Sequence, residues 1–129
     1  MARQLALDLP VSVRLGPEDF LVGGPNRLAF DLIEAWPAWP DRLLVLSGPP
    51  GSGKSHLAAI WAAQAGARTV AAAAIAADAV PGLAKAPALV VEDVDRGGVD
   101  EAALFHLVNL ARERRRDTLV TATRPLGQL

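Results

Sequence analysis

The octapeptide GPPGSGKS at residues 48–55 decides the fold, because it fits the pattern G-x-x-x-x-G-K-[ST]. The run LLVLS (43–47) precedes it, and a short apolar run bounded by turn residues is typical of a buried parallel strand. The stretch SHLAAIWAAQAGA (55–67) follows and predicts a helix that ends near Gly66. Strand, glycine-rich loop and helix in this order are the setting in which the pattern binds phosphate.

The residue types in this loop suit the phosphates of a nucleotide. Gly51 and Gly53 let the backbone curl so that successive N–H groups point at phosphate oxygens. The helix N-terminus adds a partial positive charge. Lys54 is expected to reach the β- and γ-phosphates, and the Ser55 hydroxyl to ligate Mg²⁺. The expected nucleotide-binding residues of this segment are Pro50, Gly51, Ser52, Gly53, Lys54, Ser55 and His56.

The stretch ALVVEDVD (88–95) predicts the strand that supplies the acids of such a site. Glu92 is expected to hold Mg²⁺ through its water shell, and Asp93 to orient or deprotonate the attacking water. Paired acids usually begin with Asp, and the longer Glu92 predicts slow hydrolysis because Mg²⁺ tolerates geometric error poorly. Asp95 is expected to be a solvated loop acid or a helix cap.

The stretch TLVTAT (118–123) predicts a further strand whose polar end faces the same site. A polar side chain there is placed to hydrogen-bond the γ-phosphate or the water, and Thr123 is the stronger candidate. Threonine is also an ordinary strand former, and for Thr121 that alternative has equal weight.

The remaining segments alternate between helix and strand. Helices are expected at 23–36 and at 101–116, a strand at 69–75 and a short helix at 76–80. The tryptophans of WPAWP (36–40) are expected to pack the turn between helix and strand. In the 101–116 helix, the expected cap and inward-facing residues are Asp100, Leu104, Leu107, Val108 and Ala111. This alternation predicts an α/β fold with a parallel sheet and right-handed crossovers.

Composition restricts the class of protein. The 129 residues are one domain's worth of chain, and 51% are hydrophobic, as in globular proteins. No uncharged run approaches the roughly 18 residues of a membrane helix. The absence of cysteine fits a cytoplasmic protein. A net charge of −1 predicts that DNA is contacted only locally or indirectly.

The first residues carry a separate signal, QLALDLP (4–10). Leu5, Leu7 and Leu9 alternate with smaller or polar residues, so an extended backbone places all three on one face. Two interpretations are open. The segment is either an edge strand that packs on the chain's own core or a peptide for a groove on another protein.

Together these segments resemble the AAA+ ATPases, and within them the DnaA/Hda family. The stretch EDFLVGGPNRLAFDLIEAW (18–36) is similar to the segment that closes over the adenine, which adds Leu21 and Val22 to the expected nucleotide contacts. GPPGSGKSHLA resembles the Walker A motif, ALVVEDVD the Walker B motif and LVTATRP the sensor 1 strand. Relatives often carry an acid where Thr123 stands, a second departure that predicts weak hydrolysis.

The resemblance implies a three-layer P-loop NTPase fold of the AAA+ type that lacks the C-terminal lid. Residues 1–14 would form an extended arm, and residues 15–129 a partial nucleotide-binding domain that is truncated after sensor 1. The implied cofactors are ATP or ADP with Mg²⁺.

Within that family the short arm is most like that of Hda-type proteins, which dock on the DNA polymerase sliding clamp. Gln4, Leu5, Leu7 and Leu9 would then contact the clamp, and the core would meet the initiator DnaA and promote hydrolysis of its ATP. A homo-oligomer is compatible with this role, DNA would be contacted only indirectly, and no membrane is implied. The alternatives are a fragment of DnaA itself, a helicase-loader-type ATPase that acts on DNA, and a small-molecule kinase.

Overall fold

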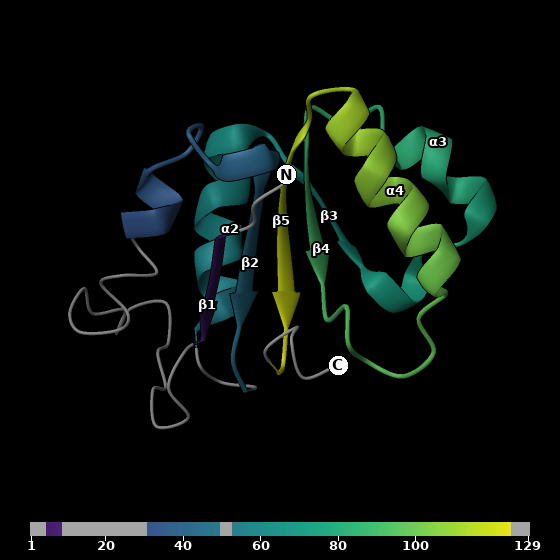
Figure 1. The fold of residues 1–129 in the computed structure, drawn as a ribbon, viewed down its shortest axis with the longest axis horizontal. Helices are drawn as coiled ribbons and strands as arrows, with labels where there is room; N and C mark the ends of the chain where they lie inside the picture. The colour runs from purple at the N-terminus through teal and green to yellow at the C-terminus, as the bar shows by residue number, and fades with distance from the viewer. Residues whose placement is uncertain (1–4, 9–30, 50–52, 125–129) are drawn as a thin grey trace.

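A parallel sheet forms the centre of the computed structural model, which describes residues 5–8, 31–49 and 53–124 (Figure 1). Within these residues the sheet has five strands in the order β1-β2-β5-β4-β3, and every neighbouring pair is parallel. The strands are β1 (Leu5–Asp8), β2 (Leu43–Ser47), β3 (Arg68–Ala71), β4 (Ala88–Glu92) and β5 (Asp117–Ala122).

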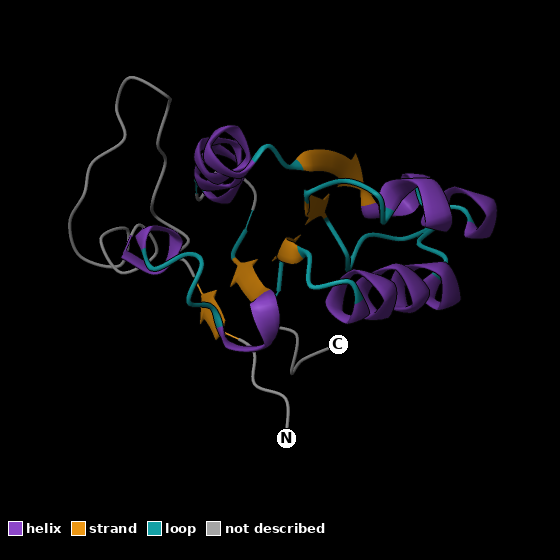
Figure 2. Cartoon of the chain, turned by 90° about the horizontal axis from the view of Figure 1, so that it is seen from above, coloured by secondary structure: helices purple, strands orange, loops and turns teal. Residues whose placement is uncertain are grey.

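Helices cover both faces of this sheet (Figure 2). Residues 31–34 and α2 pack on one face, and α3 and α4 pack on the other. The elements are η2 (Pro40–Arg42), α2 (Lys54–Ala65), η3 (Ala72–Ala74), η4 (Ala77–Ala79), α3 (Val80–Leu83) and α4 (Glu101–Glu113). None of the helices in the described segments has the length and apolarity needed to cross a bilayer.

The central strand β2 shows why the sheet needs two helical layers. Leu44 and Leu46 belong to the core on the α2 side, whereas Leu43 and Val45 belong to the core on the α4 side. All of its residues are buried, as expected for a parallel strand covered on both faces. The predicted bounds of 43–47 are confirmed.

The alanine-rich segment after α2 departs from its predicted structure. The strand predicted at 69–75 is only Arg68–Ala71, and the chain then turns into η3. Alanine forms strands weakly, and three of the four β3 residues are exposed at this edge of the sheet. The short helix predicted at 76–80 is split into η4 and α3.

The three tryptophans pack together beside α2. Trp61 is fully buried, with its ring centroid 5.9 Å from that of Trp36 and 4.9 Å from that of Trp39. Trp36 and Trp39 lie in the turn between residues 31–34 and β2, so the expected packing of that turn is confirmed.

The long helix α4 begins where the sequence predicts and ends earlier. The Asp100 carboxylate accepts a hydrogen bond from the Ala103 N–H at 3.1 Å, which confirms it as the cap. The helix ends at Glu113 and not at residue 116. Of its predicted inner face, Val108 is only partly buried, and Ala103 is buried beside the others.

The N-terminal segment lies at one edge of the sheet. Leu5–Asp8 pairs with β2 in a parallel register that places Leu5 beside Leu44 and Asp8 beside Ser47. Of the two interpretations of this segment, the backbone of these four residues therefore shows the first, an edge strand of the chain's own sheet. Gln4 and Leu9 lie outside the described residues, as do residues 23–30 of the helix predicted at 23–36.

Candidate nucleotide-binding site

Gly48 and Pro49 follow β2 at the carboxyl ends of the strands, at the lower edge of the sheet in Figure 1. The Gly48 N–H donates to the Ala122 carbonyl at 3.0 Å and so joins the loop to β5. Gly53 precedes α2 with a φ of 95°, a conformation that favours glycine. The loop therefore enters the helix through a position where a side chain would be strained. Pro50, Gly51 and Ser52 lie outside the described residues.

Lys54 is the first residue of α2 and is only 6% exposed. Its Nζ donates to the Pro49 carbonyl at 3.3 Å, so the side chain folds back over the loop. Burial lowers the pKa of Lys54, whereas the negative charges of Asp93, Asp95 and Glu92 act to raise it. The charge of this ammonium is therefore favoured by the three carboxylates, and a bound phosphate would favour it further.

Ser55 and Glu92 meet across the site. The Ser55 hydroxyl donates to Glu92 Oε1 at 3.0 Å, and this contact joins the first turn of α2 to the end of β4. The structure therefore brings together the two residues expected to hold a metal. They are 37 positions apart in the sequence.

These two side chains lie close enough together for both to act on one bound Mg²⁺, Ser55 as a direct ligand and Glu92 through a coordinated water. Their separation of 3.0 Å is that of the hydrogen bond between them. No group of three or more His, Cys, Asp or Glu residues suited to a metal occurs among the described residues. A Mg²⁺ here would take its other ligands from phosphate and water, as this ion commonly does.

Asp93 follows β4 in a left-handed backbone conformation with a φ of 59°. Its N–H donates to Thr121 Oγ1 at 3.0 Å, and the Val94 N–H donates to the Thr121 carbonyl at the same distance. Thr121 is only 1% exposed. Of the two roles open to Thr121, the structure shows the structural one, because its hydroxyl supports the Asp93 backbone.

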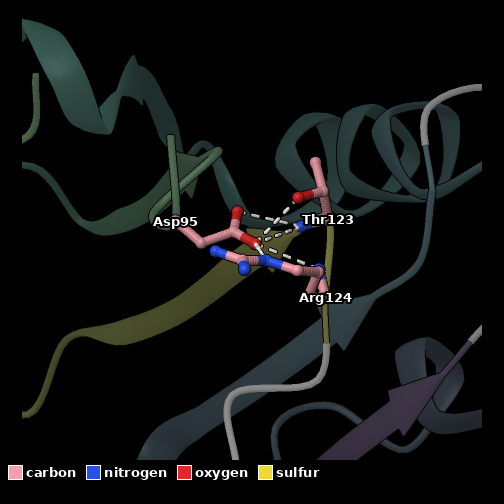
Figure 3. A network of polar contacts seen from close by, with 3 residues as sticks. All are labelled: Asp95, Thr123 and Arg124. Carbon is pink, nitrogen blue, oxygen red and sulfur yellow. Dashed lines mark hydrogen bonds and ion pairs between the residues drawn. The ribbon is translucent and has the colours of Figure 1, made fainter. Parts of the chain in front are cut away.

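The expectation for Asp95 is wrong. The Asp95 side chain is 1% exposed and is neither a solvated acid nor a helix cap (Figure 3). It accepts hydrogen bonds from the backbone N–H groups of Thr123 and Arg124 and from the Thr123 hydroxyl. Burial acts to raise the pKa of Asp95, but these hydrogen bonds outweigh it and hold the pKa below its ordinary value.

The remaining candidates are placed as follows. Thr123 directly follows β5, which ends at Ala122, and its side chain is half-buried. His56 lies in the first turn of α2 and is partly exposed. Leu21 and Val22 lie outside the described residues. A hollow of about 520 Å³ between α4 and the sheet is lined by none of the predicted site residues.

Comparison with known proteins agrees with this architecture. The sequence matches no protein-family model, and no curated protein matches it. Among solved structures, AMPPCP-bound DnaA from Aquifex aeolicus superposes on 84% of this chain with a TM-score of 0.67 and 21% sequence identity. This chain spans 41% of the length of that DnaA chain.

The strand order and this structural likeness define the fold class. The chain has a three-layer α/β fold with a parallel sheet, as the sequence predicts. More particularly, its fold is like that of DnaA.

Proposed function

We propose that this chain binds an adenine nucleotide with Mg²⁺ at the loop of residues 48–55. The observation that carries the proposal is the convergence at one sheet edge of buried Lys54 and the Ser55–Glu92 contact, with Asp93 next along the chain. The ammonium and the first turn of α2 supply positive charge for phosphates. Ser55 and Glu92 would hold the metal, which would neutralise charge on the phosphates.

We further propose that the chain is an Hda-like regulator of replication initiation. In this proposal its N-terminal segment docks on the sliding clamp, and its core meets DnaA and promotes hydrolysis of DnaA-bound ATP. The DnaA-like fold and the segment QLALDLP support this role. Glu92 and Thr123 favour slow hydrolysis by the chain itself, which the role does not require.

The position of β1 is compatible with such docking. It is four residues long and lies at the end of the strand order, where it pairs with β2 alone among the described strands. Short edge strands are released at low free energy, and a strand edge can also pair with a second chain. Three leucines would contribute about 5–9 kcal/mol to clamp binding, and ordering would remove about 2–5 kcal/mol. The balance gives an affinity no tighter than about micromolar.

A peptide of residues 2–13 is expected to bind the sliding clamp saturably, and Leu7→Asp to abolish that binding, because a carboxylate would be buried in an apolar pocket. Fluorescence anisotropy with labelled peptide measures both. Ala6→Ser is the matched control, since residue 6 lies on the opposite side of an extended peptide. Absence of binding up to millimolar peptide rejects the clamp proposal and leaves the nucleotide site untouched.

In a mixture of ATP-loaded DnaA and clamp on DNA, adding the full chain is expected to accelerate conversion of DnaA-bound ATP to ADP. The chain carrying Leu7→Asp should lose most of this stimulation, because the clamp no longer concentrates it near DnaA. Radiolabelled nucleotide bound to DnaA gives the readout. No acceleration contradicts the regulator role. Rapid, DNA-stimulated turnover by the chain alone would favour the helicase-loader alternative.

A further inference from the structure

The turn after β4 and the end of β5 are joined by hydrogen bonds from both sides. From the turn, the N–H groups of Asp93 and Val94 donate to the hydroxyl and carbonyl of Thr121. From the end of β5, Thr123 and Arg124 donate to the Asp95 carboxylate. The hydrogen-bonded residues are 27 to 29 positions apart in sequence, and together the two segments form one corner of the candidate site.

Asp95 is the acceptor around which this corner is built (Figure 3). Its Oδ1 accepts from the Thr123 N–H at 2.9 Å, and its Oδ2 accepts from the Thr123 hydroxyl at 2.8 Å and from the Arg124 N–H at 3.0 Å. The Arg124 guanidinium lies 3.6 Å away and is 59% exposed, so this ion pair adds little. The hydrogen bonds therefore carry the contact.

The hydroxyl of Thr123 donates its hydrogen to Asp95, and this limits the hydrogen bonds that Thr123 can make with a bound nucleotide. An ionised carboxylate only accepts hydrogen bonds, and a hydroxyl has a single hydrogen. The Thr123 hydrogen therefore points at Asp95 Oδ2. The remaining lone pairs of Thr123 Oγ1 can accept a hydrogen but cannot be shared with a phosphate oxygen, which is itself an acceptor.

Resting on the proposed function, we propose that Asp95 is a positioning residue that turns the Thr123 hydroxyl into an obligate acceptor for the attacking water. The pair Asp95–Thr123 thereby supplies, through a neutral hydroxyl, a weaker form of the acceptor that relatives often carry as an acid at the position of Thr123, which keeps hydrolysis possible but slow. Through the turn that it anchors, Asp95 also holds Asp93, whose left-handed backbone persists only where its surroundings fix it.

In the proposed hydrolysis of ATP, each of these side chains has a definite role. The water oxygen bonds to the γ-phosphorus, and the bond to the bridging oxygen breaks with its electron pair leaving on ADP. One water proton is hydrogen-bonded to Thr123 Oγ1, and the other passes to the Asp93 carboxylate. Asp95 does not touch the reactants, so the contribution that it makes through Thr123 falls on the chemical step.

The test is single-turnover ATP hydrolysis with the full chain in excess, together with the dissociation constants of ATP and ADP. Asp95→Asn and Thr123→Val are each expected to slow the step about tenfold, the usual effect of losing one charge-assisted or oriented hydrogen bond. For Thr123→Val, which keeps the Asp95 charge that acts on Lys54, both dissociation constants should stay within about twofold of wild type. The double variant should be no slower than the slower single variant, because the two residues act as one unit.

Rescue separates this role from a merely structural one. Adding Thr123→Asp to Asp95→Asn restores an acceptor at position 123 and is expected to recover most of the rate, whereas Thr123→Ser should keep it throughout. Asp100→Ala is the stability control, since it removes the cap of α4 and leaves the corner intact. A wild-type rate in Asp95→Asn overturns the inference, as does an equal loss of ATP and ADP affinity in Thr123→Val.

The experiments distinguish failure of the role proposed for Asp95 from failure of the proposed nucleotide binding. A chain that binds nucleotide but shows no single turnover overturns the role of Asp95 and leaves nucleotide binding in place. A chain that binds no nucleotide overturns the proposed function itself, and with it this inference. If Asp95→Asn does not fold, Thr123→Val and Thr123→Ser still give opposite predictions for the rate.

Discussion

Lys54→Ala is expected to abolish measurable nucleotide binding. The side chain is buried and donates to the Pro49 carbonyl, and in the proposed site its ammonium meets the β- and γ-phosphates. Loss of charge-assisted contacts to two phosphates corresponds to about 100-fold or more in affinity. Isothermal titration calorimetry with ATP and Mg²⁺ measures the change.

Lys85→Ala is the matched control, because Lys85 is an exposed lysine outside the site. Its nucleotide affinity should equal that of the wild-type chain. Tight binding retained by Lys54→Ala would show that the site has been assigned to the wrong loop.

The same lysine gives the binding a dependence on pH. Burial lowers the pKa of Lys54 in the free chain below its ordinary value of 10.5, and bound phosphates favour its charged form. Nucleotide binding should therefore take up a proton as the pH rises through that lowered pKa, and affinity should fall. Titrations in buffers of different ionisation enthalpy detect this proton, which the binding-competent control Lys85→Ala should take up as the wild-type chain does.

Trp61→Ala is expected to reduce the free energy of unfolding by about 3–5 kcal/mol. The side chain is fully buried and contacts both Trp36 and Trp39, so alanine leaves a cavity between α2 and the sheet. Domains of this size are stable by about 5–15 kcal/mol, so the loss is a large share of the total. Urea denaturation followed by far-UV circular dichroism measures it.

Trp61→Phe is the informative partner of that variant. Within the described residues, the Trp61 indole N–H is buried without a hydrogen-bond acceptor. Phenylalanine removes this donor and keeps most of the ring, so its cost should be below about 1.5 kcal/mol. An equal loss in both variants would contradict the cavity explanation.

The strands and loop around residues 48–55 could be predicted from the sequence because their signals are local. Both bounds of β2 follow from an apolar run between turn residues, and Gly66 ends α2 in a left-handed conformation, as expected. The length of β3 could not be predicted, because alanine prefers neither strand nor turn strongly. Period-two alternation predicts that Leu5–Asp8 is extended, but it does not say which chain the strand pairs with.

The residues of the candidate site also fall into those that the sequence predicts and those that it does not. Lys54, Ser55, Glu92 and Asp93 belong to motifs whose spacing places them at one sheet edge. Asp95 was missed because its role depends on three donors 28 or 29 residues away. No local pattern in the sequence indicates that a carboxylate just after a strand will be buried. The available signal is that Thr123 stands where the proteins that the sequence resembles often carry an acid.

The clustering of Trp36, Trp39 and Trp61 gives the molecule an optical property. The chain has three tryptophans and no tyrosine, so its near-ultraviolet absorption and emission arise almost wholly from this one group of indoles. Trp61 stands on the helix that starts at Lys54. Displacement of that helix by a ligand would thus change the intrinsic fluorescence, and the unlabelled protein carries its own spectroscopic sensor.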